Sequence, residues 1–146
     1  MSMFSALEIS GSAMGAERQR AEVVATNMAN AETTRTPSGG PFRRKQVVFS
    51  GGNNSPFQLA LAGFRRLTGR SSAVHISKVV NDPAPPVMRY EPGHPDADKS
   101  GYVAYPAINP IEEMVDLMGA TRAYQLNAAA VSATKQMIQG AMDILK

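Results

Sequence analysis

The chain has 146 residues, of which 43% are hydrophobic, so its composition fits one ordinary domain and excludes a wholly disordered protein. It contains no cysteine, which excludes disulfides, thiolate chemistry and cysteine-based zinc sites. The net charge of +3 is spread evenly along the chain and does not by itself indicate a nucleic-acid-binding protein. Only 6% of the residues are aromatic and none is tryptophan, so a self-sufficient core of large side chains is not expected.

The sequence has no membrane-spanning pattern, because no run approaches the roughly 20 apolar residues that cross a bilayer. Its first residues, MSMFSALEIS, lack the basic start and apolar block of a secretory signal. We therefore expect a protein that is soluble or that leaves the cell without a cleaved leader.

The first predicted element is a helix from about Ser5 to about Asn30. Ser5 and Glu8 have the spacing of a capping box at its start. Apolar positions recur every seven residues at Leu7, Met14, Ala21 and Met28. The predicted helix exit comprises Ala29, Asn30 and Ala31. Asn30 suits this position because asparagine tolerates left-handed backbone and bonds locally.

The middle of the chain, residues 36–108, changes character. Residues 42–49 (FRRKQVVF) alternate as a strand does, and residues 73–80 (AVHISKVV) could form another short strand. Seven of the ten prolines lie in residues 82–110, where they predict extended chain and turns instead of regular helix. Residues 50–80 as a whole have no distinctive pattern, and we assign them no role.

The last predicted element is a helix with a strong start signal. Asn109 is a favourable N-cap, Pro110 suits the first helical position, and Glu112 stands where the acid of a capping box belongs. Two sevenfold series follow: Met114, Thr121, Ala128, Lys135 and Met142, and Leu117, Tyr124, Val131, Ile138 and Leu145. A strict sevenfold repeat predicts a left-handed coiled coil. Alanine, threonine and methionine bury little area in such a seam, so we expect more than one neighbouring helix.

Together these elements predict a mainly α fold with a small irregular β region, in which long N- and C-terminal helices pair as a coiled-coil core. We expect three parts: residues 1–35 as the N-terminal core helix, 36–108 as a linker with a small β-rich or extended middle region, and 109–146 as the C-terminal core helix. Periodicity alone is equally compatible with an internal helical hairpin and with packing between chains.

One polar cluster, EPGHPDAD, brings His94 close in sequence to Asp96 and Asp98 and raises the question of a metal or acid/base site. No second histidine lies close by, and no nucleophile partner can be identified. Polar turn chemistry explains the cluster better. We predict no catalytic residue, no metal ligand and no cofactor, and we expect that the protein is not an enzyme.

A basic segment, FRRKQ, could bind phosphate together with Arg65, Arg66 and Arg70. Single-strand binding normally needs several stacking aromatics, and only Phe42 is adjacent. A strand edge protected by charge, or a charged subunit contact, explains the segment as well. A small nucleic-acid-binding protein therefore remains an alternative. The glycines of FSGGNN and PSGGP match no phosphate-binding pattern and indicate turns.

Two long segments resemble the FlgC-type proximal-rod proteins of the bacterial flagellum. They are ISGSAMGAERQRAEVVATNMANAETTRTPSGGPFRRKQVVF and YEPGHPDADKSGYVAYPAINPIEEMVDLMGATRAYQLNAAAVSATKQM. The stretches ANAETT and NPIEEMV resemble a signature shared by flagellar rod and hook proteins in general, whereas PGHPDAD followed by GYV narrows the likeness to the proximal rod.

The resemblance implies a structural subunit that stacks helically into the rod, which transmits motor torque across the periplasm. The implied partners are further copies of the chain, other proximal and distal rod proteins, the rod-base adaptor and the MS ring. The resemblance also implies export through the flagellar type III apparatus without a cleaved signal peptide, and ends that are disordered before assembly. A subunit of another part of the flagellar axial structure is the alternative.

On this interpretation the terminal helices supply the assembly interface, and the polar tips of Tyr124 and Asn127 help to set its register. The expected interface residues are Leu7, Met14, Ala21, Met28, Ala29, Asn30, Met114, Leu117, Thr121, Tyr124, Asn127, Ala128, Val131, Ile138 and Leu145. Candidate outer contacts are Arg43, Arg44, Pro92, Gly93, His94, Pro95, Asp98 and Tyr102.

Overall fold

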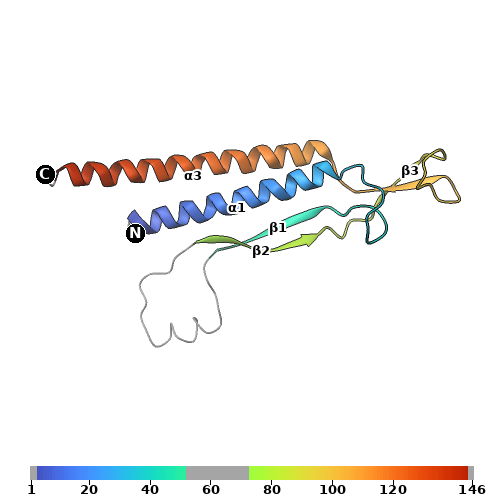
Figure 1. The fold of residues 1–146 in the computed structure, drawn as a ribbon, viewed down its shortest axis with the longest axis horizontal. Coiled ribbons are helices and arrows are strands. Elements are labelled where there is room, and N and C mark those ends of the chain that lie inside the picture. The colour runs from blue at the N-terminus through green and yellow to red at the C-terminus, as the bar shows by residue number, and fades with distance from the viewer. Residues whose placement is uncertain (1–2, 52–72, 145–146) are drawn as a thin grey trace, which may run out of the picture. The chain divides into compact units, whose positions relative to one another are not determined.

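The computed structural model describes residues 3–51 and 73–144, and it consists of two long helices with short strands between them in sequence (Figure 1). The elements are α1 (Met3–Ala29), β1 (Lys45–Gly51), β2 (Val74–Asn81), β3 (Val87–Tyr90), β4 (Tyr102–Tyr105) and α3 (Pro110–Ile144). β1 pairs with β2, and β3 pairs with β4, in two separate two-stranded sheets. The predicted mainly helical fold with a small strand region is confirmed.

The start of α3 follows from the residues that precede it. The side-chain oxygen of Asn109 accepts the backbone N–H of Ile111 at 3.1 Å, which satisfies one of the amides that a helix start leaves without a helical partner. The carbonyl of Asn109 accepts the N–H of Glu113, also at 3.1 Å. The side-chain amide of Asn109 in turn donates to Glu112 at 3.2 Å. The predicted N-cap is confirmed.

The ends of α1 differ in part from the prediction. The helix begins at Met3, so Ser5 lies within its first turn and is not its cap. At the other end, Asn30 donates its backbone N–H to the carbonyl of Thr26 at 3.2 Å and its side-chain amide to the same carbonyl at 2.8 Å. No described residue other than glycine has a positive φ. Asn30 therefore ends the helix through local hydrogen bonds and not through left-handed backbone.

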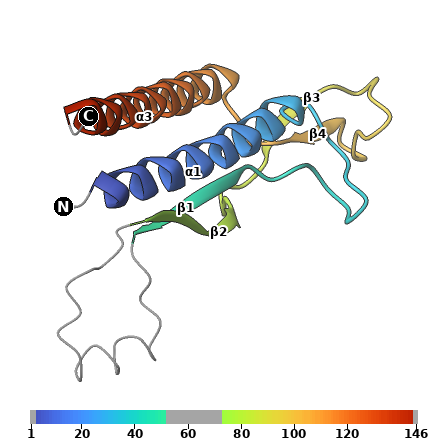
Figure 2. The same ribbon diagram turned by 60° about the vertical axis from the view of Figure 1, so that its left-hand side comes forward.

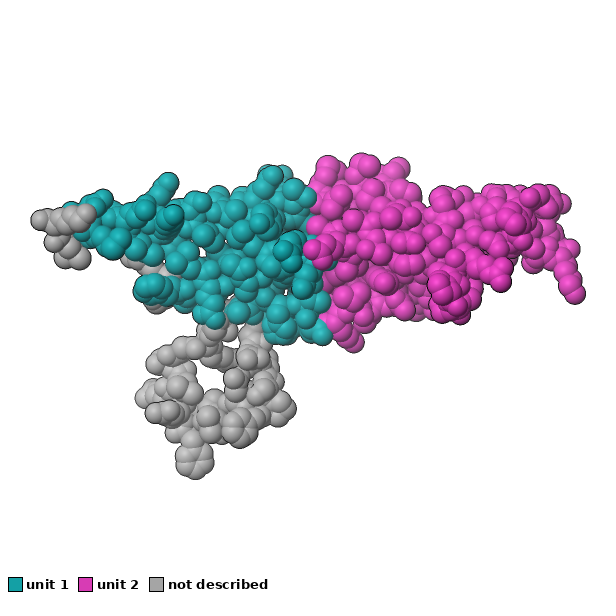
Figure 3. Space-filling view, viewed as in Figure 1, with its two compact units in different colours: residues 1–19, 49–77, 120–146 teal, residues 20–48, 78–119 magenta. Residues whose placement is uncertain are grey.

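The chain divides into two compact units (Figure 3). Unit 1 comprises residues 1–19, 49–77 and 120–146, and unit 2 comprises residues 20–48 and 78–119. Each unit therefore contains one stretch of α1 and one stretch of α3. Within each unit these two stretches lie side by side in both views (Figures 1 and 2).

Unit 1 buries small side chains. Ala16 and Ala120 are 4% and 1% exposed, and Thr134 is 7% exposed. The hydroxyl of Ser12, on α1, accepts the N–H of Val74 at 3.0 Å and so ties the first residue of β2 to the helix. Small residues permit a close approach of the helices, but each contributes little buried apolar area.

Unit 2 contains the hairpin of β3 and β4. Its strands are antiparallel, with Val87 opposite Tyr105 and Tyr90 opposite Tyr102. Side chains alternate between the two faces of a strand, and Val103 and Tyr105 on one face are 0% and 6% exposed. The sequence analysis predicted extended chain and turns here but missed the pairing. The prolines of this region all lie outside the two strands, so they delimit the hairpin without removing its hydrogen bonds.

The less exposed positions of α3 recur with the spacing of a heptad repeat. They include Glu113, Leu117, Ala120, Asn127, Val131, Thr134 and Ile138. One of the two predicted series contributes Leu117, Val131 and Ile138. The complementary series runs through Glu113, one position before the predicted Met114, which is 52% exposed.

Candidate functional site

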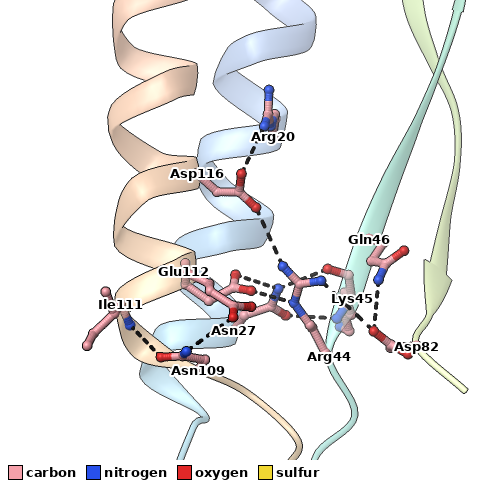
Figure 4. Close-up of polar contacts among 11 residues, drawn as sticks. Arg20, Asn27, Arg44, Lys45, Gln46, Asp82, Asn109, Ile111, Glu112 and Asp116 are labelled. Atoms are coloured by element: carbon pink, nitrogen blue, oxygen red, sulfur yellow. Dashed lines mark hydrogen bonds and ion pairs between the residues drawn. The ribbon is translucent and has the colours of Figure 1, made fainter. Parts of the chain in front are cut away.

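Arg44 lies at the centre of an ion-pair network in unit 2 (Figure 4). It precedes β1, and its guanidinium donates through Nε to Glu113 in the first turns of α3. Its Nη2 lies 3.5 Å from Asp116, one turn further along α3, and its Nη1 lies 3.9 Å from Asp82, which follows β2. Arg20, on α1, pairs with Asp116 at 3.2 Å. The network thus joins four separate segments of the chain.

The buried members of the network are Glu113 and Asn27, each 1% exposed. The side-chain amide of Asn27 donates to Glu113 at 3.0 Å and to the carbonyl of Lys45 at 2.9 Å. The side-chain oxygen of Asn27 accepts the N–H of Lys45 at 2.9 Å. Asn27 therefore pairs with Lys45 as a neighbouring strand would, and it fixes the end of α1 against the start of β1. A buried carboxylate requires partners of this kind.

The charges of the network act on Arg44. Burial lowers the pKa of Arg44, but the hydrogen bond to Glu113 and the negative charges of Glu113, Asp116 and Asp82 together outweigh it and raise the pKa above its ordinary value. Arg44 is therefore cationic throughout the accessible pH range. The network has a structural role, because its contacts join α1, the start of β1 and α3 within unit 2.

The loop between β3 and β4 uses its polar residues to shape the turn. The ring nitrogen Nδ1 of His94 accepts the N–H of Asp96 at 3.1 Å, and Asp98 accepts two following backbone amides at 2.8 and 2.9 Å. The hydroxyl of Thr34 donates to Asp96 at 2.8 Å, which anchors the loop to the segment after α1. In these contacts the polar side chains bond to nearby backbone amides and to a hydroxyl, as polar residues of a turn do. Within residues 3–51 and 73–144, no group of three or more acids and histidines could hold a metal ion.

Tyr105 connects the hairpin to the start of that loop. Its hydroxyl donates to Glu91 at 2.8 Å, and this hydrogen bond is the main reason that the pKa of Tyr105 is raised. The guanidinium of Arg89 lies 4.5 Å from the centre of the same ring. We call the face of the hairpin that carries Val103 and Tyr105 its inner face. A cation stacked on an aromatic ring and a charge-assisted hydrogen bond stabilise this face.

A cavity of about 130 Å³ lies beside the network, and it is smaller than the roughly 300–1,000 Å³ of small-molecule sites. Its lining residues are Gly39, Gly40, Pro41, Phe42, Arg43, Arg44, Asp82, Ala84, Pro86, Pro106 and Ala107.

A second feature of the molecule is an exposed apolar stripe on α3. Ile111, Val115, Met118, Leu126 and Met137 are 73%, 58%, 59%, 64% and 56% exposed. At about 100° per residue these five side chains fall within an arc of about 100°. The less exposed heptad positions are centred about 160° away on the helix surface. α3 therefore has apolar side chains on two opposite sides.

The predicted interface residues fall into three groups. Half-buried are Leu7, Met14, Ala21, Met28, Asn30, Leu117, Asn127, Ala128, Val131 and Ile138. Exposed are Ala29, Met114, Thr121 and Tyr124. Leu145 lies outside the described residues, as do Arg65, Arg66 and Arg70 of the proposed phosphate-binding patch.

Of the candidate outer contacts, Arg44 and His94 are half-buried. The exposed ones are Arg43, Pro92, Gly93, Pro95, Asp98 and Tyr102.

The sequence analysis missed most of the network, namely Arg20, Asn27, Asp82, Glu113 and Asp116. Two of them had a usable signal. Asn27 lies three residues after Val24 and eleven after Ala16 on one face of α1, and Glu113 lies one heptad before Ala120. A polar residue on a buried stripe indicates a specific partner, although the pattern does not identify that partner.

Two family models match the chain, one at each end. The model described as flagella basal body rod protein matches residues 7–35, and the model described as flagellar basal body rod FlgEFG protein C-terminal matches residues 99–144. These matches cover most of both helices and the end of the hairpin. Among the described residues, no helix is both long and apolar enough to cross a membrane.

Similar proteins extend over the full chain. The flagellar basal-body rod protein FlgC of Borreliella burgdorferi is 36% identical over 100% of this chain and 99% of its own length. FlgC of Bacillus subtilis is 36% identical over 100% of both chains, and FlgC of Yersinia enterocolitica is 38% identical over 94% of both. With this identity over its whole length, and with a matching pair of terminal helices, the chain belongs to the FlgC family of flagellar basal-body rod proteins.

Proposed function

We propose that this protein is a structural, non-enzymatic subunit of the proximal rod of the flagellar basal body. Copies of the chain assemble helically with one another and with other rod proteins into the shaft that transmits motor torque. The relatives that carry this proposal are named as basal-body rod proteins and are similar over the full chain.

The exposed apolar stripe of α3 is the observation that supports assembly. A helix that is apolar on two opposite sides needs a neighbour on each side, because one neighbour covers only one stripe. Leu126 and Ile111, which are 64% and 73% exposed, would cost free energy if they stayed in water. Several large exposed apolar side chains on one side of a helix indicate an interaction site.

The small number of buried side chains supports the same proposal. Nine of the described residues are buried: Ala16, Val24, Asn27, Val103, Tyr105, Pro106, Glu113, Ala120 and Thr134. Few of these are large and apolar, so burial within one copy contributes little stability. We infer that the terminal helices reach full order when neighbouring subunits cover them.

We place the three predicted parts in this assembly as follows. Residues 1–35 and 109–146 form the axial core, and residues 36–108 lie outside it. The further partners are distal rod proteins, the rod-base adaptor and the MS ring. The rod lies in the periplasm, and the subunit arrives there through the flagellar type III export apparatus without a cleaved signal peptide. Family membership supports these points.

The test replaces Leu126 by Asp in cells whose wild-type copy has been deleted. Ser132→Asp is the matched control, because Ser132 is exposed, is changed to the same charge, and lies about 120° around the helix from Leu126. We expect Leu126→Asp to leave the circular dichroism of the purified chain unchanged while it abolishes basal bodies and motility. Ser132→Asp should assemble. Wild-type numbers of basal bodies in the Leu126→Asp strain would contradict the proposal.

A further inference from the structure

The outer face of the β3–β4 hairpin carries three large exposed side chains. Met88, Tyr90 and Tyr102 are 53%, 65% and 43% exposed, whereas Val103 and Tyr105 on the other face are buried. Met88 and Tyr90 alternate with Arg89 along β3, and Tyr90 stands opposite Tyr102 in the register. We call Met88, Tyr90 and Tyr102 the hairpin patch.

The two tyrosines of the hairpin patch pack against each other although they are exposed. The rings of Tyr90 and Tyr102 meet edge to face, with centroids 5.3 Å apart and an interplanar angle of 65°. Gly101 has a φ of +79°, and a Cβ there would lie 2.8 Å from Cε2 of Tyr90 and 3.3 Å from Cβ of Pro92. A side chain at position 101 would therefore collide with the Tyr90 ring, and only glycine leaves room for it. A preorganised aromatic side chain loses little entropy when it binds a partner, and tyrosine is enriched among the residues that dominate interfaces.

A complementary group lies on α3. Arg122 is exposed within the apolar stripe, four residues after Met118 and four before Leu126. In the part of the chain that the structure describes, Arg122 has no hydrogen-bond or ion-pair partner. A cation between two apolar side chains fits a surface of aromatic rings, because the face of a ring attracts positive charge.

We propose that the hairpin patch of one copy binds the Arg122–Leu126 segment of α3 in a second copy. The guanidinium of Arg122 stacks on the ring of Tyr90 or Tyr102, and Leu126 packs against Met88. The inner face of the same hairpin already uses this chemistry, since Arg89 lies 4.5 Å from the centre of the Tyr105 ring. The choice of a second copy rests on the proposed function.

The hairpin patch is too small to form a stable interface by itself. Aromatic side chains bury about 150–250 Å² each, so the partly exposed Tyr90 and Tyr102 together with Met88 supply a few hundred Å², against about 800 Å² per partner in a standard stable interface. Such a contact does not hold a free dimer together, but it adds to the helix contacts of an assembly through multivalency. Because it joins two different surfaces, it is heterologous and permits open helical growth instead of closed pairs.

Disulfide trapping tests the contact, and the absence of native cysteine makes it specific. The variants Met88→Cys and Leu126→Cys are co-produced in cells without the wild-type copy, and isolated basal bodies are oxidised. We expect a mixed disulfide dimer at a yield about ten-fold above either homodimer, because bridging requires Cα atoms within about 7 Å. Lys135→Cys replaces Leu126→Cys in the control. Lys135 is exposed, lies about 180° around the helix from Leu126, and should give no mixed dimer.

The outcomes separate this inference from the proposed function. If both cysteine variants are present in basal bodies and no mixed dimer forms, the contact is wrong while the structural role stands. A disulfide from Met88→Cys to another rod protein, in place of this chain, also overturns the choice of a second copy. Absence of the wild-type chain from basal bodies contradicts the proposed function itself.

A second test needs no cysteine: Arg122 and Tyr90 are replaced one at a time, and basal bodies are counted. Tyr90→Phe keeps the aromatic ring, and we expect it to assemble as the wild type does. Arg122→Lys keeps the charge but loses the planar guanidinium, so we expect an intermediate number of basal bodies. Arg122→Glu and Tyr90→Ala should lower the number of basal bodies by about five-fold or more. Unchanged numbers in both of these strains would overturn the contact, provided that circular dichroism shows folded protein.

Discussion

Replacement of Arg44 by Met should destabilise the subunit strongly. Glu113 is 1% exposed, and without the guanidinium its remaining side-chain partner in the network is the neutral amide of Asn27. Removal of one partner from a buried ion pair costs about 3–5 kcal/mol, because the other charge stays buried without compensation. Since the Arg44 side chain is 23% exposed, water reaches part of the pair, and we expect about 3 kcal/mol, the lower end of that range.

Replacement of Glu113 by Met should lower the free energy of unfolding by less than replacement of Arg44. After Glu113→Met, Arg44 keeps Asp116 and Asp82 as partners and reaches water, so we expect a loss of about 1–2 kcal/mol. The double Met variant removes both charges and refills their volume with apolar groups, a replacement that is often close to neutral. The two single losses should therefore not add, and with a double variant close to neutral the coupling free energy should be close to their sum, about 4 kcal/mol.

Urea unfolding of the purified wild type and the three variants measures these differences, with circular dichroism as the signal. Hydrogen exchange in residues 20–48 and 78–119 then shows whether the loss is confined to unit 2. Arg43→Met is the control. Arg43 is adjacent to Arg44 in the sequence but its side chain is exposed, so its replacement should change the free energy of unfolding by less than about 0.5 kcal/mol. A loss below about 1 kcal/mol for Arg44→Met, or additive single losses, would refute the reasoning.

Three further predictions concern unit 2. Asn27→Ala should cost about 2 kcal/mol in urea unfolding, since it leaves both backbone groups of one strand residue unpaired, and a neutral result would contradict that role. Gly101→Ala should lower stability by about 1–2 kcal/mol because of its positive φ, whereas Gly93→Ala should be neutral; equal melting temperatures would disprove this. The pKa of Tyr105 is raised in the folded chain, so its contribution is present below the unfolded pKa of about 10 and is lost as pH rises through the folded pKa. Urea unfolding from pH 8 to 11 should show this loss in the wild type and not in Tyr105→Phe, and parallel curves would speak against it.

Sequence patterns predicted the elements well where neighbouring residues decide them. The N-cap at Asn109 is confirmed, and the predicted strands at residues 42–49 and 73–80 overlap β1 and β2. The hairpin of β3 and β4 was missed, because its strands have four residues each and lie among prolines that argue against regular structure. Strand pairing is a contact between distant residues, and local propensity does not report it.

Periodicity on α3 identified the heptad spacing and one of its two series. The other series was placed one residue late, on Met114 instead of Glu113, because a methionine is the better candidate for a buried position when only polarity is considered. The exposed stripe at Ile111, Val115 and Leu126 was not distinguished from the less exposed one for a related reason. Both sides of α3 contain apolar residues, so hydrophobicity does not say which side its own chain covers.

Short-range features of the sequence decide the helices, their ends and the family likeness. They are the cap at Asn109, the prolines and the sevenfold spacing. These features depend on local backbone preferences, which short stretches of sequence contain in full. Burial of Glu113 depends on Arg44, which lies 69 positions away in the chain, and on Asn27, 86 positions away. A charge enters the interior only where folding brings its partners to it, so the tertiary structure alone decides which polar residues become part of the core.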